Sequence, residues 1–198
     1  MNLPIAKYGD PVLRLKGRRV EKMDDRIREL AADMLETMHA ANGVGLAAQQ
    51  VGEALQLTVL DVLQTEDRPS TLRLNGREIE LLAAMPLILL NPTIALDRET
   101  DIGTEGCLSF PEITAEIERS VAVNVQAETL EGNPIEIEAT GLLARALQHE
   151  VDHLNGILFI DRMSSVAKAS LQSRLKRLRK ETLRGEKQNP ARASQINL

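Results

Sequence analysis

The spacing of hydrophobic residues changes along this chain, and the first clear pattern is helical. Between Asp25 and Ala41 the apolar positions recur three and four residues apart. These positions are Ile27, Leu30, Ala31, Met34, Leu35 and Met38. Asp24 or Asp25 is suited to cap the start of this segment, and Gly43 stands where a left-handed residue would end it. The pattern predicts an amphipathic helix near the N-terminus.

The next part of the chain has the short apolar runs and the alternation that are typical of strands. We expect strands at residues 55–63, 87–90, 120–129 and 134–138. Asn75-Gly76 separates residues 72–74 from 77–79 and is a two-residue turn signal, so it predicts a tight hairpin. A second hairpin is expected at residues 131–133.

Two further helices are predicted in the last third of the chain. One runs from about Gly141 to Leu154, and the other, which is weakly apolar and strongly basic, from about Ser165 to Arg184. The first has a core face of Leu143, Leu147, Val151 and Leu154 and a second face of Leu142, Ala146, His149 and His153. The polar residues after Gly185 are expected to fray. The predicted fold class is α+β: a single domain whose strands and hairpins wrap around a central helix, with one N-terminal and one C-terminal helix.

Composition limits the class of protein. With 198 residues, 43% hydrophobic and 27% charged, the chain has the balance of one globular domain. The longest apolar stretch, residues 81–90, is interrupted by Pro86 and is too short to cross a membrane. The N-terminus has no export signal, and a single cysteine excludes an internal disulfide, which is typical of a reducing compartment. We therefore expect a cytoplasmic protein with no membrane partner.

Charge divides the chain into two parts. From Ser164 to the end there are nine Lys/Arg and two Asp/Glu, a local +7, so the overall charge of −5 leaves −12 on the remainder. This division predicts two parts with different tasks, an acidic body at residues 1–164 and a basic C-terminal helix with its tail at residues 165–198. Three aromatic residues are too few for a base-stacking surface, and no sequence-specific binding to nucleic acid is expected.

The strongest chemical motif is H-E-x-x-H at His149–His153, inside the predicted central helix. Residues four apart lie on the same helix face, so both imidazoles can reach one metal ion. Glu150 can then touch a water on that ion without being a ligand, and it can accept a proton as the water attacks a carbonyl. A helix that only happens to carry two surface histidines is the alternative.

A catalytic site of this kind uses a third protein ligand and keeps one position open. The acids downstream, Asp161 and Glu181, are poorly placed, and no histidine follows His153. Upstream, Cys107 lies in Glu105-Gly106-Cys107-Leu108-Ser109. A lone cysteine is more often a small buried hydrophobe, but a missing third ligand favours Cys107 as the candidate. A third motif, residues 43–50, combines glycines and alanines with Gln50 and leaves the backbone open.

In these three segments the chain resembles the bacterial peptide deformylases. The family's G-φ-G-φ-A-A-x-Q, E-G-C-L-S and Q-H-E-x-D-H-L-x-G motifs match residues 43–50, 105–109 and 148–156, in that order. The opening residues 8–14 are also similar, and the resemblance covers about residues 3–163. Residues 64–85 look longer than the family's usual connection, as an inserted hairpin would.

The resemblance implies a role for each matched position. Cys107, His149 and His153 would hold the metal, and Glu150 would be the general base. The Gln50 side chain and the backbone N–H of Leu108 would stabilise the oxyanion. Glu105 would pair with Arg119. The expected pocket for the methionine side chain is lined by Val44, Gly45, Leu142, Arg145 and Ala146. At Arg145 we expect the stem to pack while the charged head reaches water.

The implied activity is a metallo-amidohydrolase reaction, the removal of formate from N-formylmethionyl ends of nascent polypeptides. The family usually works with one Fe²⁺ per chain, although Zn²⁺, Ni²⁺ or Co²⁺ can occupy the site. The basic C-terminal helix would touch the ribosome. Two other interpretations compete: a zinc endopeptidase whose third ligand is not Cys107, and a non-catalytic, metal-stabilised module that binds the ribosome. Glu150 and Gln50 argue against the second, because a closed structural site needs neither.

Overall fold

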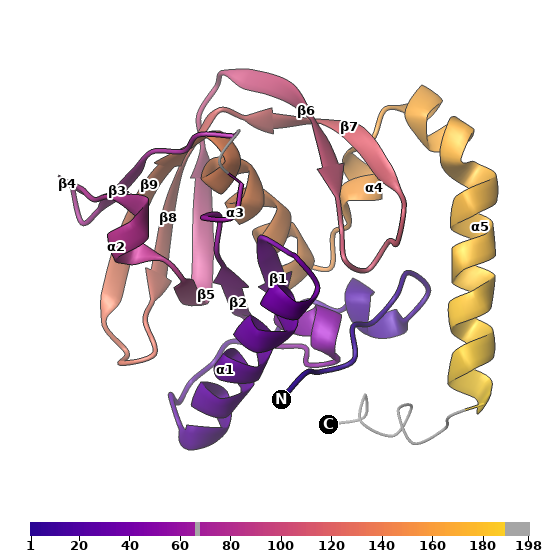
Figure 1. The fold of residues 1–198 in the computed structure, drawn as a ribbon, viewed down its shortest axis with the longest axis horizontal. Coiled ribbons are helices and arrows are strands. Elements are labelled where there is room, and N and C mark those ends of the chain that lie inside the picture. Colours follow the sequence, from indigo (N-terminus) through magenta and orange to yellow (C-terminus); the bar gives the residue numbers. More distant parts are fainter. Residues whose placement is uncertain (66–67, 189–198) are drawn as a thin grey trace.

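The computed structural model describes residues 1–65 and 68–188 (Figure 1). Its helices are η1 Pro11–Arg14, α1 Asp25–Ala40, η2 Ala48–Val51, α2 Leu81–Ala84, α3 Gly141–Leu154, α4 Phe159–Arg162 and α5 Ser165–Gln188. Its strands are β1 Gly45–Ala47, β2 Leu57–Leu60, β3 Leu72–Leu74, β4 Arg77–Glu78, β5 Leu87–Leu96, β6 Thr100–Gly106, β7 Thr114–Ser120, β8 Ala122–Glu128 and β9 Pro134–Thr140. The predicted α+β class is confirmed.

The strands form two antiparallel sheets on either side of α3. Seven strands in the order β1-β2-β5-β8-β9-β3-β4 make the larger sheet, and β6 pairs only with β7. The helix α3 lies between the larger sheet and the β6–β7 hairpin (Figure 1). Almost every residue of α3 is buried, including both faces expected from the sequence. The central helix is thus enclosed by strands, and its side chains are held from several directions.

Three hydrophobic clusters meet around α3. One joins α3 to the larger sheet, and a second joins α1 to β1 and β2. The third gathers Phe110, Phe159 and Ile117 with the N-terminal segment and with one face of α5. Burial of this kind contributes about 25 cal/mol for each Å² of apolar surface, and the first cluster, which contains five residues of α3, fixes the helix on the larger sheet.

Of the two expectations for the ends of α1, the N-terminal cap is confirmed and the left-handed residue at the C-terminal end is wrong. The Asp24 side chain caps the helix by accepting from the Ile27 amide at 3.0 Å. The left-handed residue at the other end is Asn42, with φ 54°, and not Gly43. Asparagine tolerates this conformation better than most residues. Gly43 is needed for space instead, because a Cβ there would lie 2.8 Å from Cδ1 of Leu108.

Most of the remaining elements agree with the sequence. Asn75 and Gly76 both have positive φ, as a two-residue hairpin turn requires, and β3 pairs with β4. The helix α5 continues past Gly185 to Gln188, so the expected fraying there is wrong for residues 185–188, and residues 189–198 lie outside the described part of the chain. Among the helices of the described ranges, none has the length and hydropathy needed to cross a membrane.

Candidate metal centre

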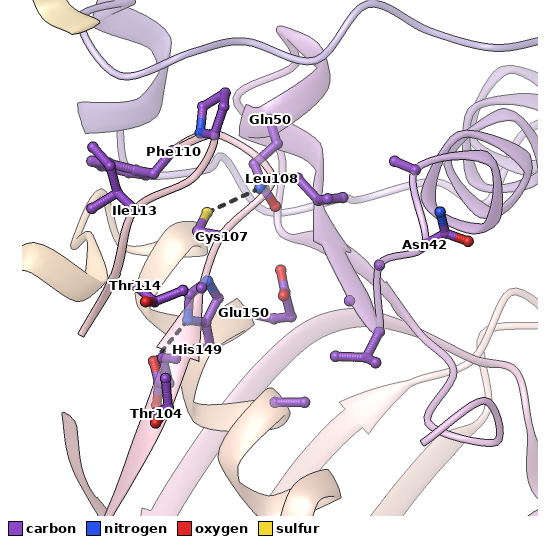
Figure 2. Close-up of a pocket in the computed structure, with 18 of the residues that line it drawn as sticks. Asn42, Gln50, Thr104, Cys107, Leu108, Phe110, Ile113, Thr114, His149 and Glu150 are labelled. Atoms are coloured by element: carbon purple, nitrogen blue, oxygen red, sulfur yellow. Dashed lines mark hydrogen bonds and ion pairs between the residues drawn. The ribbon is translucent and has the colours of Figure 1, made fainter. Parts of the chain in front are cut away.

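The site is assembled from three separate parts of the chain. His149 and His153 lie one helical turn apart on α3, with ring centroids 4.9 Å apart. Cys107 follows directly after β6, and Gln50 lies on η2, which continues from β1. Figure 2 shows Cys107, His149 and Glu150 grouped around one cavity. The fold therefore brings together the three motifs that the sequence singled out.

The proposed ligand atoms are close enough to share one ion. The Sγ of Cys107 lies 3.2 Å from Nε2 of His153, and one donor atom from each of Cys107, His149 and His153 falls within 4.8 Å of the others. The Nδ1 of His149 is engaged elsewhere, so its Nε2 is the nitrogen available to a metal. One sulfur and two imidazole nitrogens suit a first-row transition metal and leave a coordination position open.

The electrostatics of the two histidines also bear on a bound cation. Burial lowers the pKa of His153 well below its usual value, so this ring is neutral and able to bind metal. Burial also opposes a charge on His149, but its hydrogen bonds to Cys107 and Glu105 outweigh burial and raise its pKa well above the usual range. The pocket between these groups therefore favours positive charge, and a divalent cation would supply it.

Glu105 is held by both an imidazole and a guanidinium. His149 donates from Nδ1 to Oε2 of Glu105 at 3.0 Å, and Arg119 donates to both carboxylate oxygens, at 2.8 and 3.0 Å. Burial opposes ionisation, but these donors outweigh it and lower the pKa of Glu105 to about 2. The expected Glu105–Arg119 pair is confirmed. The hydrogen bond to His149 was not expected, and it leaves Nε2 as the ring nitrogen that could face a metal.

Glu150 is a buried carboxyl group next to the ligands. Only 4% of the residue is exposed, and its Oε2 has no hydrogen-bond partner within the described part of the chain. Burial raises its pKa to about 7, although the positive charge on His149 opposes this shift. A carboxyl group with this pKa can accept and return a proton near neutral pH, as a general base must.

The glutamine of the first motif is aimed at the same cavity. The Oε1 of Gln50 accepts from the Ala47 amide at 2.9 Å, which turns its Nε2 toward Ser109 Oγ and Cys107 Sγ, at 3.3 and 3.5 Å (Figure 2). Its neighbour Gln49 points away from the site. Leu108 lines the cavity beside Gln50, and Lys7 donates from Nζ to the Leu108 carbonyl at 2.7 Å. That contact orients the peptide unit that follows Leu108.

The ligands open into a cavity of about 550 Å³. All five expected pocket residues line it, namely Val44, Gly45, Leu142, Arg145 and Ala146. The expectation for the head of Arg145 is wrong: its side chain is only 7% exposed, and it bonds to Glu105 and Asp101 instead of water. The sequence analysis also missed Lys7, Arg68, Thr104, Phe110, Ile113 and Thr114, which line the same cavity. Of these six residues, only Phe110, Ile113 and Thr114 could have been anticipated, because they follow Cys107 closely in the sequence.

A proton-accepting carboxyl group beside a three-ligand metal site, at the bottom of an open cavity, is the arrangement of a metal-dependent hydrolase. The comparisons with known proteins narrow this class. The family described as polypeptide deformylase matches residues 2–169. Peptide deformylases of Opitutus terrae and Methylacidiphilum infernorum are 46% and 44% identical, over 96% and 91% of this chain and 100% and 94% of theirs. The chain belongs to the peptide deformylase family.

Solved structures agree with this assignment. A plant peptide deformylase has a TM-score of 0.80 at 33% identity, over 95% of this chain and 93% of its own. The enzyme of Thermus thermophilus has a TM-score of 0.77 at 38% identity, over 91% and 99%. A Synechococcus elongatus peptide deformylase solved with actinonin has a TM-score of 0.74 at 38% identity, over 87% of each chain. The family is metal-dependent, so the Cys-His-His cluster is the expected place for its ion.

Proposed function

We propose that this chain removes the formyl group from N-formylmethionyl ends of nascent polypeptides and releases formate, using Cys107, His149 and His153 as metal ligands. Family membership supports the reaction. The observation that carries the assignment of residues is the convergence of these three side chains with the buried, unpartnered Oε2 of Glu150. A structural metal site would need no such carboxyl group and would be closed to the cavity.

The reaction assigns a task to each group around the cavity. A divalent metal ion at the site would lower the pKa of a water molecule and polarise the formyl carbonyl. Glu150 accepts the proton of the attacking water and later passes it to the departing amino group, so that formate and a free N-terminus result. The Nε2 of Gln50 and the backbone N–H of Leu108 donate to the oxyanion that forms on the formyl oxygen as water attacks the formyl carbon.

The apolar part of the cavity is suited to the methionine side chain. Val44, Leu142 and Ala146 present carbon atoms to it, and Gly45 contributes backbone without a side chain. An unbranched thioether adapts well to an irregular apolar pocket. We propose that this wall positions the formyl carbon over Glu150 by holding the neighbouring side chain.

The decisive experiment measures formate from a formyl-Met tripeptide. We expect stoichiometric release of formate and a free N-terminus, with every internal peptide bond intact. The acetyl-Met form of the same peptide is the control for the size of the acyl group. Cleavage of internal bonds would favour the zinc endopeptidase, and metal binding without any turnover would favour the non-catalytic module.

For the metal we propose Fe²⁺, one ion per chain, with Zn²⁺, Ni²⁺ or Co²⁺ able to replace it. Mixed thiolate and imidazole ligands are compatible with all four ions, so the donor set alone does not select one. Metal analysis of protein purified without oxygen tests the proposal. One equivalent of iron is expected, and an equivalent of zinc under the same conditions would contradict it.

We further propose that residues 1–164 form the catalytic unit and that α5 binds the ribosome, which places the enzyme in the cytoplasm. The helix packs Leu171, Leu175 and Leu178 in the third cluster, and its basic side chains are exposed. These are Arg174, Lys176, Arg177, Arg179, Lys180 and Arg184. A surface of this charge favours an anionic partner such as ribosomal RNA.

Reversal of exposed charges on α5 tests the proposed ribosome binding without changing the leucines that pack against the third cluster. Lys176→Glu, Arg177→Glu and Lys180→Glu together should weaken co-sedimentation with ribosomes and flatten its dependence on salt, because fewer counterions are released. Formate release from a tripeptide should not change. The matched control reverses Lys22, Arg28 and Arg98, three exposed cations on the body. Equal losses of ribosome binding in both variants would contradict a specific role for α5.

A further inference from the structure

We propose that Arg145 is a positioning residue for the metal ligand His149, acting through Glu105, rather than a wall of the methionine pocket. This inference rests on the proposed function, because it assumes that His149 binds the metal. It concerns a residue whose position on the cavity wall gave a different expectation from the sequence. The position of the Arg145 guanidinium and its hydrogen bond to Glu105 support this inference.

The two terminal nitrogens of the Arg145 guanidinium are directed at acceptors on β6 and β7. Its Nη1 donates to Glu105 Oε1 at 3.1 Å and to the Ile117 carbonyl at 2.9 Å. Its Nη2 donates to the Oδ1 and the backbone carbonyl of Asp101, at 2.6 and 3.3 Å. Only the stem of Arg145 is left for the cavity. A buried arginine with this many partners is placed precisely, and its removal would leave acceptors without donors.

The carboxylate of Glu105 receives two donors on each oxygen. Oε1 accepts from Arg145 and from Nε of Arg119, and Oε2 accepts from Nη2 of Arg119 and from Nδ1 of His149. This fills the lone-pair positions of a carboxylate. Its plane is therefore fixed, and the direction of the His149 ring is fixed with it. Without Arg145, Oε1 would keep a single donor, and the carboxylate would be held less firmly by the three donors that remain.

Arg119 alone is not an equivalent support, because it also serves another carboxylate. Its Nη1 donates to Asp152 Oδ2 at 2.5 Å, and Asp152 is held in turn by Arg162. One arginine therefore stands between two buried acids, Glu105 and Asp152. Arg162 is the second guanidinium at Asp152, and Arg145 is the second guanidinium at Glu105, where an unbalanced buried charge would be costly.

The helix makes the arrangement rigid. Arg145 and His149 are four residues apart on the same face of α3, so the backbone fixes the distance between the group that clamps Glu105 and the ring that Glu105 orients. The strand β6 leaves room for the clamp at Gly103, where a Cβ would lie 3.1 Å from Cζ of Arg145. Hydrogen bonds thus link Arg145 to Glu105 and Glu105 to His149 on one side of the proposed metal site.

The test compares Arg145→Leu with Arg145→Lys in the full-length protein. Leucine keeps an apolar side chain at the cavity but removes every hydrogen-bond donor. Lysine keeps the positive charge but loses the planar set of donors of the guanidinium. The readouts are the affinity for Co²⁺, measured by competition with a chelator, and the visible spectrum of the Co²⁺ protein. We expect Arg145→Leu to weaken Co²⁺ binding by about 10- to 100-fold, the usual effect of losing such a partner, and to shift the spectrum. Arg145→Lys should show a smaller loss in the same direction.

Leu143→Ala is the matched control for stability. Leu143 is fully buried on the same helix and contacts neither Glu105 nor a ligand, so its truncation should lower the melting temperature while Co²⁺ affinity and spectrum stay unchanged. If Arg145→Leu does not fold, Arg145→Lys alone decides by its affinity. Unchanged affinity and spectrum, with only a higher KM for the formyl peptide, would overturn the proposal. Wild-type protein that binds Co²⁺ but releases no formate would contradict the proposed function and leave this comparison valid.

Discussion

Gly45 leaves the space that the Glu150 carboxyl group occupies. A Cβ at this position would lie 2.8 Å from Cδ of Glu150, which real Cβ atoms do not tolerate, so the carboxyl group would have to move. We predict that Gly45→Ala lowers kcat by about 10²-fold or more, the lower range of the effect of a general base. Metal content should stay at one ion per chain, and metal analysis alongside kcat separates this outcome from a damaged site. Gly43→Ala is a useful comparison because it would crowd Leu108 instead.

Two substitutions should separate catalysis from metal binding. Glu150→Gln preserves the shape of the side chain but removes the base, so kcat should fall by about 10²- to 10⁴-fold with full metal content. Gln50→Ala should cost about 10²- to 10³-fold in kcat through the loss of one oxyanion donor. Gln49→Ala is the control, because the Gln49 side chain bonds to the Leu154 carbonyl, away from the cavity. A near-normal kcat in Glu150→Gln would mean that another group is the base.

The substitution Cys107→Ser tests the third ligand. A hydroxyl group is a harder and weaker donor than a thiolate, so the variant should retain little metal after dialysis against a chelator. Wild-type protein loaded with Fe²⁺ should also lose activity in air, and reloading with Ni²⁺ should prevent this loss. Full metal content and full activity in Cys107→Ser would contradict the assignment.

At the level of single residues, the sequence was informative where chemistry depends on local spacing. The i,i+4 histidines with an adjacent glutamate identify a metal site on a helix, and the lone cysteine follows as the missing donor. The bond between Glu105 and His149 joins residues 44 positions apart, and no local pattern predicts it. Arg145 was misread because an arginine on a helix usually sends its charge to water. Here β6 and β7 cover the helix and provide acceptors instead.

Among the elements, α5 is the one whose role the structure changes most. No candidate site residue lies beyond Ser164, so the sequence alone gives α5 no part in the activity on small peptides. Leu175 is however only 6% exposed and packs in the cluster that holds Phe110, and Arg174 donates to the Glu112 carbonyl on the wall of the cavity. The helix is therefore part of the support of the pocket.

We predict that truncation after Ser164 destabilises the catalytic unit. Loss of one buried leucine costs about 1.5–3 kcal/mol, and the partly buried Leu171 and Leu178 add to this. The melting temperature should fall clearly, while kcat for a formyl tripeptide well below that temperature stays within a few-fold of wild type. Leu175→Ala should reproduce part of the fall without removing any charge. An unchanged melting temperature would show that α5 contributes no packing energy.

Among the elements that the sequence failed to predict, β6 and β7 have a clear physical reason. The hairpin of β6 and β7 is mostly polar and exposed, and β7 turns the charged Arg119 inward beside Ile117, so the usual apolar alternation is interrupted. The first helix, the larger sheet and α3 were predictable because they bury apolar faces with a regular period. A strand whose inward-facing side chains belong to a cluster of ion pairs lacks the apolar alternation that identifies a strand in the sequence.

For the molecule as a whole, we expect metal binding and stability to be linked. The proposed ligands come from residues far apart in sequence, so the unfolded chain lacks the site and a bound ion would stabilise the folded state. Free metal at 100 times its Kd would contribute about 2.7 kcal/mol. A chelator should therefore lower the melting temperature, and added Zn²⁺ or Co²⁺ should restore it. Cys107→Ser, as the control, should show little change with chelator. Equal melting temperatures for metal-free and metal-loaded wild type would contradict the linkage.

The order of the site's segments along the chain also sets the time at which this enzyme can mature. Synthesis produces residues 43–50 first and 105–109 much later, and α3 follows only after about seven-tenths of the chain has been made. Until that helix is released and enclosed by the strands already present, the cysteine has no histidines beside it. A growing chain is consequently unable to select its ion. The proposed ligands would therefore act as one set only in the finished fold.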